Sequence, residues 1–282
     1  MRWAWMQANL AGSIGEQLRY ARQQLAHLET PRLDAELLLA HTLNVDRTWL
    51  IAHHDAPCGE DNARSYLDLV MRRAQHEPVA YLTSHRAFWE HDLFIAAGAL
   101  VPRPETERLV EIALSLDDGQ PKVVLDLGTG SGCIALSLAC AKPQWDVFAI
   151  DIEGPALRIA QKNLKSCTNA ALIQGNWLDA LRLDSVDLIV SNPPYIAPTD
   201  AHLETLTHEP IRALVAENEG FAAYEAIVPI ATRTLKPGGA LLFEHGIDQR
   251  KRLVTLMQEN GFDVQAFDDL TRRPRVLMGT HR

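Results

Sequence analysis

The chain has few cysteines, no long apolar run and no block of a single charge. Its four cysteines, Cys58, Cys133, Cys140 and Cys167, show neither the pairing of a metal site nor the density of a disulfide framework, so we expect reduced thiols and no bound metal. No uninterrupted apolar run reaches the roughly 18 residues of a membrane span, and the first residues lack the apolar core of a signal peptide. We therefore expect a cytoplasmic protein without a membrane partner.

A strongly basic character is also missing. The 282 residues carry a formal net charge of -9, with acidic and basic residues interspersed. A protein that grips a nucleic acid backbone over a wide surface needs the opposite balance, so we expect no direct nucleic acid partner. The length suits one large domain with a second, smaller one.

The first part of the chain predicts a small helical domain over residues 1–76. Apolar residues recur at the spacing of one helix face in 13–28, in 33–43 and in the run that contains Leu67, Val70, Met71 and Ala74. Pro78 follows where the last of these helices should have ended. Over residues 77–102 apolar, aromatic and polar residues alternate, which favours a β-hairpin that connects the helical domain to the rest of the chain.

From residue 103 to 282 the pattern is typical of an α/β domain, a Rossmann-like fold with a mainly parallel sheet. Short β-branched runs alternate with longer helical patterns, and the predicted strands are 122–127, 146–151, 170–175, 186–191, 239–245, 262–267 and 274–280. The last two are separated by too few residues for a helical crossover, so we expect an antiparallel last strand.

A glycine-rich turn follows the first predicted strand. Gly128, Gly130 and Gly132 lie between a buried strand and a helix, where glycine lets the backbone approach a ligand closely. Their spacing departs from the dinucleotide fingerprint, because the third glycine comes one residue early. The glycines alone are weak evidence for a ligand, because a tight strand-to-helix turn without a ligand is the alternative.

Asp151 supplies that second signal at the end of the next strand. An acidic side chain about twenty residues after the glycine turn can accept hydrogen bonds from both hydroxyls of a ribose, which indicates an adenosine-containing ligand. Alone, Asp151 would be read as a helix cap or a solvated strand end. Asn176, Trp177 and Asp179 follow the third strand, where the Trp177 ring could lie against an adenine or simply fill the core.

The most specific motif is Asn192-Pro193-Pro194-Tyr195, directly after the fourth strand. An amide nitrogen is a poor nucleophile because its lone pair is delocalised, so an enzyme that alkylates it must hold it. The Asn192 side-chain oxygen and the Pro193 carbonyl can each accept one N–H of an NH₂ group, while the prolines fix the backbone. Tyr195 would pack against the flat amide. The alternative is a proline-stiffened loop without a ligand.

With these motifs the sequence resembles the release factor glutamine methyltransferases, the HemK or PrmC family. The similarity covers nearly the whole chain and includes LVPRPETE at 100–107, GTGSG at 128–132, NPPYI at 192–196, His208-Glu209-Pro210 and KPGGALLFEHG at 236–246 with Gln249. It ends in an Asp-Leu and Arg-x-Arg pattern at Asp269, Leu270, Arg273 and Arg275. One departure is Thr83-Ser84-His85, where family members usually carry a glycine, which puts the turn geometry there in doubt.

The resemblance implies transfer of a methyl group from S-adenosyl-L-methionine to the side-chain amide nitrogen (N5) of the glutamine in the Gly-Gly-Gln motif of class I peptide chain release factors. Because the helical domain has no cofactor motif of its own and is joined by a connector, we expect it to recognise this protein substrate. Arg103, Glu105 and Thr106 would close the cofactor pocket. The implied cofactor-binding residues are Gly128, Thr129, Gly130, Ser131, Gly132, Asp151, Trp177 and Asn192. The implied substrate-binding residues are Asn192, Pro193, Pro194 and Tyr195, of which Asn192, Pro193 and Tyr195 are the catalytic ones.

Two rival functions share parts of this pattern. A glutamine methyltransferase of a large-subunit ribosomal protein has the Asn-Pro-Pro-Tyr and His-Glu-Pro motifs as well, but Arg103-Pro104-Glu105-Thr106-Glu107 favours the release factor enzyme. An adenine-N6 nucleic acid methyltransferase would need a basic target-recognition region, which this acidic chain does not show. No residue in the sequence is singled out as the base that accepts the proton lost on methylation.

Overall fold

The structure is a computed structural model that describes residues 12–177 and 184–282. The chain divides into two compact units, Met1–Ser84 and His85–Arg282. The sequence predicted the end of the helical domain at residue 76, so the division lies eight residues later. The additional residues belong to a short helix whose Leu82 and Val79 pack in the helical core.

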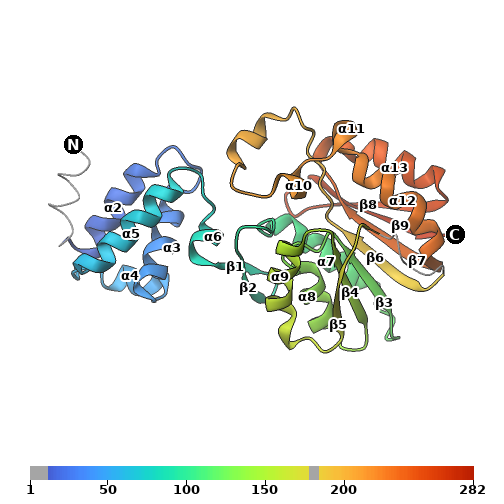
Figure 1. Cartoon of the computed structure of the whole chain (residues 1–282), viewed down its shortest axis with the longest axis horizontal. Coiled ribbons are helices and arrows are strands. Elements are labelled where there is room, and N and C mark those ends of the chain that lie inside the picture. The colour runs from blue at the N-terminus through green and yellow to red at the C-terminus, as the bar shows by residue number, and fades with distance from the viewer. Residues whose placement is uncertain (1–11, 178–183) are drawn as a thin grey trace. The chain divides into compact units, whose positions relative to one another are not determined.

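The described part of the first unit is helical (Figure 1). Ser13 and Glu16 form a reciprocal capping box at the start of its first helix, which satisfies two backbone N–H groups there. Tyr66 is fully buried and donates its hydroxyl hydrogen to the Ala35 carbonyl at 3.0 Å, which ties the fourth of these helices to the second. The helices are α2 Ile14–Gln24, α3 Pro31–Leu43, α4 Arg47–Ala52, α5 Glu60–Arg73 and α6 Val79–Thr83.

The predicted hairpin is present but shorter than expected. Strands β1 (His85–Phe88) and β2 (His91–Phe94) pair antiparallel, whereas Val79–Thr83 forms helix α6, so the prediction of strand structure from residue 79 was wrong. Burial of Leu82 in the helical core overrides the strand-like alternation of this segment. Ser84, near the position of the usual family glycine, ends α6 with a φ of 59°, in the left-handed region that costs a non-glycine residue about 1 kcal/mol.

The second unit contains a seven-stranded sheet in the order β5-β4-β3-β6-β7-β9-β8. Strands β3 to β7 are parallel, and β9 pairs antiparallel with both β7 and β8. The predicted Rossmann-like fold with an antiparallel last strand is therefore confirmed. The strands are β3 Val123–Leu127, β4 Asp146–Asp151, β5 Ala170–Gln174, β6 Val186–Ser191, β7 Leu235–Glu244, β8 Phe262–Asp268 and β9 Pro274–His281.

Helices cover both faces of this sheet, with α8 and α9 on one face and α12 and α13 on the other (Figure 1). The central strands are buried on both sides, as the near-continuous apolar runs of parallel strands require. The helices are α7 Glu107–Ser115, α8 Cys133–Ala141, α9 Gly154–Asn163, α10 Ile211–Leu214, α11 Glu217–Gly220, α12 Ala222–Thr234 and α13 Arg250–Glu259, with short 3₁₀ turns η1 Pro104–Thr106, η2 Leu164–Ser166, η3 Ala201–Thr205 and η4 Ile247–Gln249.

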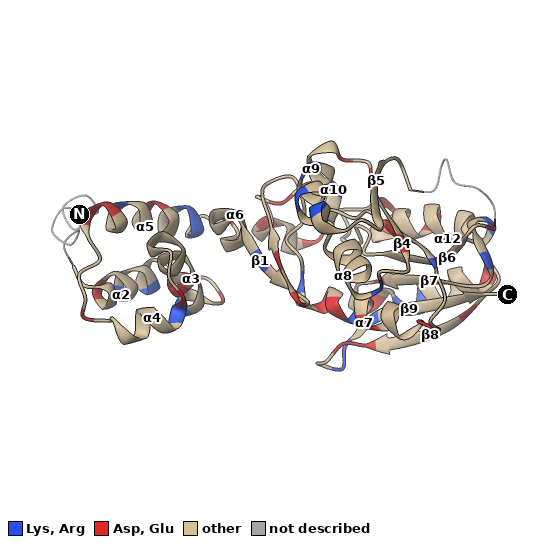
Figure 2. Ribbon diagram, turned by 90° about the horizontal axis from the view of Figure 1, so that it is seen from below, with Lys and Arg blue, Asp and Glu red and all other residues tan. Residues whose placement is uncertain are grey.

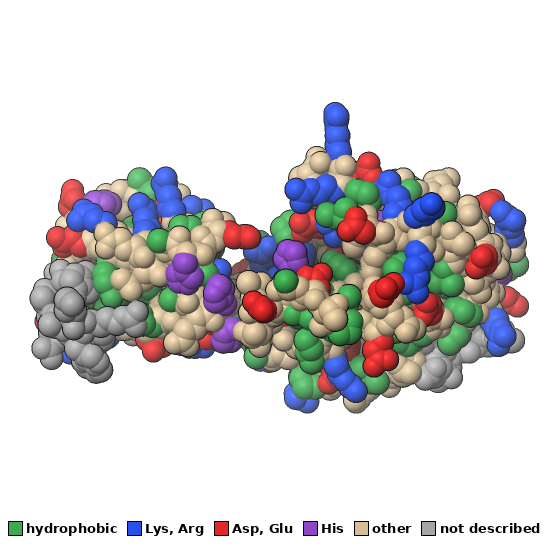
Figure 3. Space-filling view, turned by 90° about the horizontal axis from the view of Figure 1, so that it is seen from above, with side chains coloured by type: hydrophobic (Ala, Val, Ile, Leu, Met, Phe, Trp, Pro, Cys, Tyr) green, Lys and Arg blue, Asp and Glu red, His purple; other side chains and the backbone are tan. Residues whose placement is uncertain are grey.

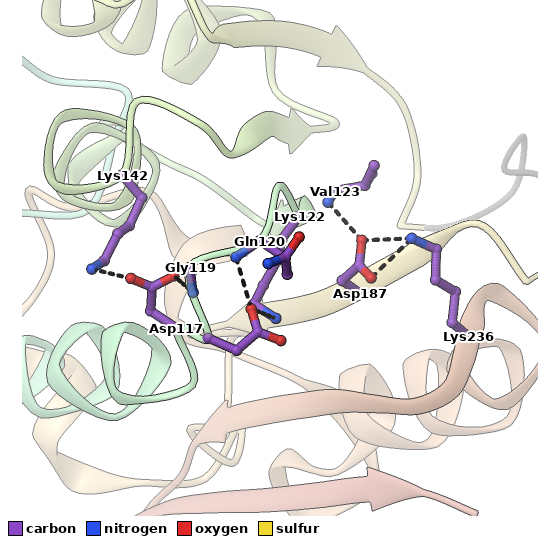
Figure 4. A network of polar contacts seen from close by, with 9 residues as sticks. Asp117, Gly119, Gln120, Lys122, Val123, Lys142, Asp187 and Lys236 are labelled. Carbon is purple, nitrogen blue, oxygen red and sulfur yellow. Dashed lines mark hydrogen bonds and ion pairs between the residues drawn. The ribbon is translucent and has the colours of Figure 1, made fainter.

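A polar network joins three neighbouring strands at their amino ends (Figure 4). The Asp187 carboxylate of β6 accepts hydrogen bonds from the Val123 backbone N–H of β3 and from the Lys236 ammonium of β7, both at 2.8 Å. Nearby, the Asp117 carboxylate pairs with Lys142. These charges lie at the opposite end of the strands from the glycine turn, so their role is to fix the sheet and not to meet a ligand.

No helix among residues 12–177 and 184–282 is long and apolar enough to cross a membrane. Acidic and basic residues are interspersed along the elements of the second unit (Figure 2). The face seen in Figure 3 likewise carries both charges side by side, without a broad basic patch.

Candidate active site

The register of the sheet brings three predicted site residues together. Leu127 at the end of β3 pairs with Ile150 of β4 on one side and with Ser191 of β6 on the other. The next residues along the chain after these three are Gly128, Asp151 and Asn192. They leave the carboxyl edge of the sheet next to one another, at the edge where open α/β sheets bind ligands.

The glycine turn requires glycine for its backbone shape. Gly128, Gly130 and Gly132 have φ of 70°, 55° and 81°, in the left-handed region that residues with a Cβ avoid. A Cβ on Gly132 would also lie 3.1 Å from the Ala160 Cβ, so this glycine lets α8 pack closely against α9. The turn thereby exposes backbone at its start and packs tightly at its end.

A buried carboxylate below the turn holds it in place. Asp126 is fully buried in β3, and its Oδ2 accepts hydrogen bonds from the Thr129 hydroxyl at 2.6 Å and the Ala135 backbone N–H at 3.1 Å. Burial raises the pKa of Asp126 to about 7, although these hydrogen bonds oppose the rise. The predicted residue Thr129 is itself buried, so it braces the turn through Asp126.

Asp151 is held by the backbone on both sides. Its Oδ2 accepts the Gly130 N–H at 2.9 Å, and its Oδ1 accepts the Glu153 N–H at 2.8 Å. Burial raises the pKa of Asp151, and the two backbone hydrogen bonds oppose this rise. Each oxygen keeps acceptor capacity for a ligand hydroxyl, because a carboxylate oxygen has two lone pairs.

A cavity of about 120 Å³ opens over the glycine turn and Asp151. Trp177 borders it, with a ring atom 3.4 Å from where a Cβ on Gly128 would stand, so that the ring lies against the turn. Ile152 also lines the cavity, although its side chain is 49% exposed. Apolar side chains beside a doubly held carboxylate suit a flat base joined to a ribose, so these residues fit the adenosine part of the implied cofactor.

The predicted cofactor residues divide into two groups. Those that line the cavity are Gly128, Gly130, Asp151, Trp177 and Asn192, together with Asn176. Those that are buried below the turn are Thr129, Ser131 and Gly132. The second group shapes the backbone of the turn. Asp179, which the sequence suggested as a neighbour of this cavity, lies outside the described residues.

A second cavity of about 90 Å³ adjoins the first at the end of β6. Asn192 lines both cavities, Pro194 lines the first, and Pro193 and Tyr195 line the second. The motif thus stands at the junction of two cavities. Of the residues proposed to close the cofactor pocket, Arg103 lines the second cavity, Glu105 is exposed and Thr106 is buried beneath Asn192.

A chain of hydrogen bonds lies behind the motif. The Asn192 amide nitrogen donates to the Thr106 hydroxyl oxygen at 3.1 Å, and that hydroxyl donates to Glu244 Oε2 at 2.6 Å. The Tyr195 hydroxyl donates to the other oxygen, Oε1, at 3.4 Å. Glu244 is 1% exposed, and its burial raises its pKa while the Thr106 hydroxyl and Arg275 oppose the rise. Glu244 lies within the KPGGALLFEHG motif at 236–246, but the sequence did not predict a role for it at the site, because its partners Thr106 and Tyr195 are distant in the chain.

The backbone of the motif is clamped from a second direction. The Gln249 amide nitrogen donates to the Tyr195 carbonyl at 2.9 Å, and its oxygen accepts the Gly246 backbone N–H at 3.0 Å. Gly220 has a φ of 86°, and a Cβ there would lie 2.1 Å from the Tyr195 carbonyl oxygen. Only glycine therefore allows α11 to approach the motif so closely.

Glu209 connects the segment after β6 to the segment before η1. Its carboxylate is nearly buried and accepts the Val101 backbone N–H at 2.9 Å and the Arg103 guanidinium at 2.6 Å. This contact forms the rim of the second cavity, which Arg103 lines. The position of Glu209 gives the His208-Glu209-Pro210 motif a structural role at the site.

Comparisons with known proteins agree with this geometry. A family model described as the PrmC N-terminal domain matches residues 16–83, and one described as the methyltransferase small domain matches residues 106–219. A release factor glutamine methyltransferase of Xylella fastidiosa is 44% identical over 254 residues, which is 88% of this chain and 92% of that protein. Its counterpart in Escherichia coli is 38% identical over 269 residues, or 94% and 97% of the two chains.

The chain belongs to the release factor glutamine methyltransferase family. Among solved structures, a methyltransferase from Pyrococcus furiosus is similar with a TM-score of 0.52 and 18% identity, over 69% of this chain and 90% of that one. A ribosomal protein L11 methylase from Lactobacillus delbrueckii subsp. bulgaricus has a TM-score of 0.50 and 20% identity, over 67% and 84%. These two similarities show the fold of the second unit.

Membership in the release factor glutamine methyltransferase family confirms several predictions. The enzyme is a methyltransferase that depends on S-adenosylmethionine, and it methylates protein. The residue assignments within the site stay predictions, because family membership does not test them one by one.

Proposed function

We propose that this protein transfers a methyl group from S-adenosyl-L-methionine to the N5 nitrogen of the glutamine in the Gly-Gly-Gln motif of class I release factors. The observation that carries the proposal is the position of Asn192, which lines the cavity over the glycine turn and also the neighbouring cavity that Pro193 and Tyr195 line. A side chain shared by two cavities can hold a group from one ligand against a group from another.

The chain's own residues would align the glutamine amide with the methyl group of the cofactor. Asp151 and Trp177 would hold the adenosine, and the backbone at Gly128 and Gly130 would pass close to the rest of the cofactor. When bound, the cofactor supplies an electrophilic methyl group on a sulfonium. Asn192 Oδ1 and the Pro193 carbonyl would each accept one N–H of the glutamine amide, and the cavity walls would exclude water.

The relatives' names supply the substrate part of this proposal, since several of them at 38–44% identity are named release factor glutamine methyltransferases. Release factors act on ribosomes, so the reaction would take place in the cytoplasm. The first unit, matched by the PrmC N-terminal model, has no cofactor motif of its own, and we assign it to recognition of the release factor.

A direct assay tests the proposal. The protein is incubated with methyl-labelled S-adenosylmethionine and a purified class I release factor, and mass spectrometry locates the label. We expect one methyl group on the glutamine of Gly-Gly-Gln and none on a factor in which alanine replaces this glutamine. Label instead on a large-subunit ribosomal protein or on adenine in DNA, offered in parallel, would favour one of the rival functions.

A further inference from the structure

Two buried residues outside both cavities control the amide of Asn192. Thr106, in η1, is 2% exposed, and Glu244, at the end of β7, is 1% exposed. The Thr106 hydroxyl lies between the Asn192 amide nitrogen at 3.1 Å and Glu244 Oε2 at 2.6 Å. Neither residue lines the cofactor cavity or its neighbour, so neither is placed to touch a ligand.

The number of available hydrogens fixes the direction of this chain. A hydroxyl has one hydrogen, and an ionised carboxylate can only accept. The hydrogen bonds from Thr106 and Tyr195 and the nearby Arg275 favour the ionised form of Glu244 against the effect of burial. The Thr106 hydrogen therefore goes to Glu244, and the Thr106 oxygen can only accept from Asn192. The Asn192 NH₂ group must then face Thr106. An amide turned the other way would set its carbonyl oxygen against the Thr106 oxygen, two acceptors without a hydrogen between them.

Holding the NH₂ group also fixes the direction of the Asn192 side-chain carbonyl oxygen. With its NH₂ group held by Thr106, Asn192 offers its carbonyl oxygen in the opposite direction. A glutamine NH₂ group can donate to that oxygen, whereas a glutamate carboxylate would bring oxygen against oxygen. The second oxygen of Glu244 accepts the Tyr195 hydroxyl at 3.4 Å and lies 3.9 Å from Arg275. One buried carboxylate thus orients two residues of the motif.

We propose that Glu244 is a positioning residue for Asn192. Acting through the Thr106 hydroxyl, it turns the side-chain carbonyl oxygen of Asn192 toward the substrate amide. The inference rests on the proposed function, because it presumes that an amide NH₂ group is the methyl acceptor. It adds two residues to the machinery, from segments 138 positions apart in the chain. It also gives a function to the buried carboxyl group at the end of a hydrophobic strand.

The test is a matched pair of substitutions at Thr106. Thr106→Val keeps the branched shape but removes the hydroxyl, whereas Thr106→Ser keeps the hydroxyl. We expect Thr106→Val to lower kcat for release factor methylation by at least about tenfold, and Thr106→Ser to stay within about threefold of the unmodified enzyme. The dissociation constant for S-adenosylmethionine should change by less than about twofold in both variants, because Thr106 does not line the cofactor cavity.

Substitutions of Glu244 provide an independent second measurement if Thr106→Val does not fold. Glu244→Gln keeps an oxygen that can accept from Thr106 and an amide that can bond Tyr195, so kcat should stay within about threefold. Glu244→Leu removes both acceptors and should lower kcat as Thr106→Val does. Full activity of Thr106→Val or Glu244→Leu would overturn the inference. The inference would also be overturned if cofactor binding and kcat fell together in Thr106→Val or Glu244→Leu and were not restored in Thr106→Ser or Glu244→Gln.

These outcomes are distinct from a failure of the proposed function. If the unmodified enzyme methylated no release factor, the proposed function would fail before any variant was compared. If the unmodified enzyme was active and Thr106→Val and Glu244→Leu were equally active, only the positioning role would fail.

Discussion

At the scale of single residues, Asn192 bears the greatest part of the proposed chemistry. Its side chain lines both cavities, and its amide nitrogen is engaged by Thr106. Asn192→Ala should lower turnover at least about a hundredfold, because the acceptor that aligns the substrate nitrogen is lost. Cofactor affinity should fall modestly at most. Single-turnover kinetics with release factor, together with calorimetry for the cofactor, measure the two effects separately.

Asn192→Asp is the sharper variant. It keeps the shape and an acceptor oxygen but replaces the NH₂ group that faces Thr106 and adds a negative charge near the sulfonium. We expect equal or tighter cofactor binding with a large loss of rate. A variant that methylated release factor near the original speed would show that the motif is structural.

Asp151 allows a second test at the residue scale. Both of its oxygens are held by backbone N–H groups, and the residue lines the first cavity. Asp151→Ala should weaken S-adenosylmethionine binding by about 1.5 to 3 kcal/mol, the range for lost hydrogen bonds to a charged group. Asp146→Ala is the control, because Asp146 is exposed at the opposite end of the same strand. Equal affinities for the two variants, measured by calorimetry, would remove Asp151 from the ribose site.

Asp126 predicts a pH dependence of stability. Burial raises its pKa in the folded state to about 7, above the value near 3.9 of an unfolded aspartate. The folded state therefore binds an extra proton between these two values. This contribution to stability is fully present below about pH 4 and is lost as the pH rises through about 7, with a total of up to about 4 kcal/mol.

Asp126→Asn should remove this contribution, because an amide does not titrate in this range. Urea unfolding of both proteins from pH 4.5 to 8, without cofactor, measures it as the difference between two curves, so that other titrating groups cancel. We expect the difference to change steadily up to about pH 7 and to level off above it. A constant difference across the range would mean that Asp126 is ionised throughout.

At the scale of elements, Glu209 fastens the segment between β6 and α12 to the segment before η1. It is one residue with two partners, the Val101 backbone N–H and the partly exposed guanidinium of Arg103. Glu209→Ala should lower the free energy of unfolding by about 2 kcal/mol, since hydrogen bonds to a buried charge are lost. Glu204→Ala, an exposed change on the same segment, should have almost no effect. Thermal unfolding of both variants decides the matter.

Elements with a strong local signal were predictable from sequence. All seven strands of the large sheet lie within a few residues of their predicted positions, because each contains a short run of apolar or alternating residues bounded by turn residues. Residues 79–83 were not predictable in this way, since a five-residue alternation is ambiguous and packing of Leu82 decides for helix. The start of β7 at Leu235, four residues early, also carries two glycines that weaken a strand pattern.

The site was predictable in part for the same reason. Gly128, Asp151 and Asn192 lie at strand ends, and the register of the sheet places them side by side. The chain of hydrogen bonds from Asn192 through Thr106 to Glu244 joins residues 86 and 138 positions apart. No local pattern in the sequence records such a contact. The contact forms only because the fold brings η1 next to the end of β7 and to the residue that follows β6.

At the scale of the whole molecule, the chain forms two units with separate hydrophobic cores, and we propose that they have separate functions. The described residues that line the cofactor cavity and its neighbour lie between Gly98 and Leu214, within His85–Arg282. The first unit has its own core around Leu38, Leu39 and Tyr66. An enzyme that only needed a glutamine side chain would not require this unit, so its presence favours recognition of a larger protein surface.

A truncated chain that begins at His85 tests this division. It should fold, because it keeps the whole sheet and its covering helices, and it should bind S-adenosylmethionine with nearly unchanged affinity. On an intact release factor we expect kcat/KM to fall at least about tenfold, equivalent to about 1.4 kcal/mol of lost recognition. On a short peptide that contains Gly-Gly-Gln, the truncated and full chains should be equally slow, because the peptide lacks the surface that the first unit would contact. The peptide is therefore the control for damage to the active site. If the truncated chain methylated the intact factor as fast as the full chain, recognition would reside in the catalytic unit alone, and the helical unit would need another role.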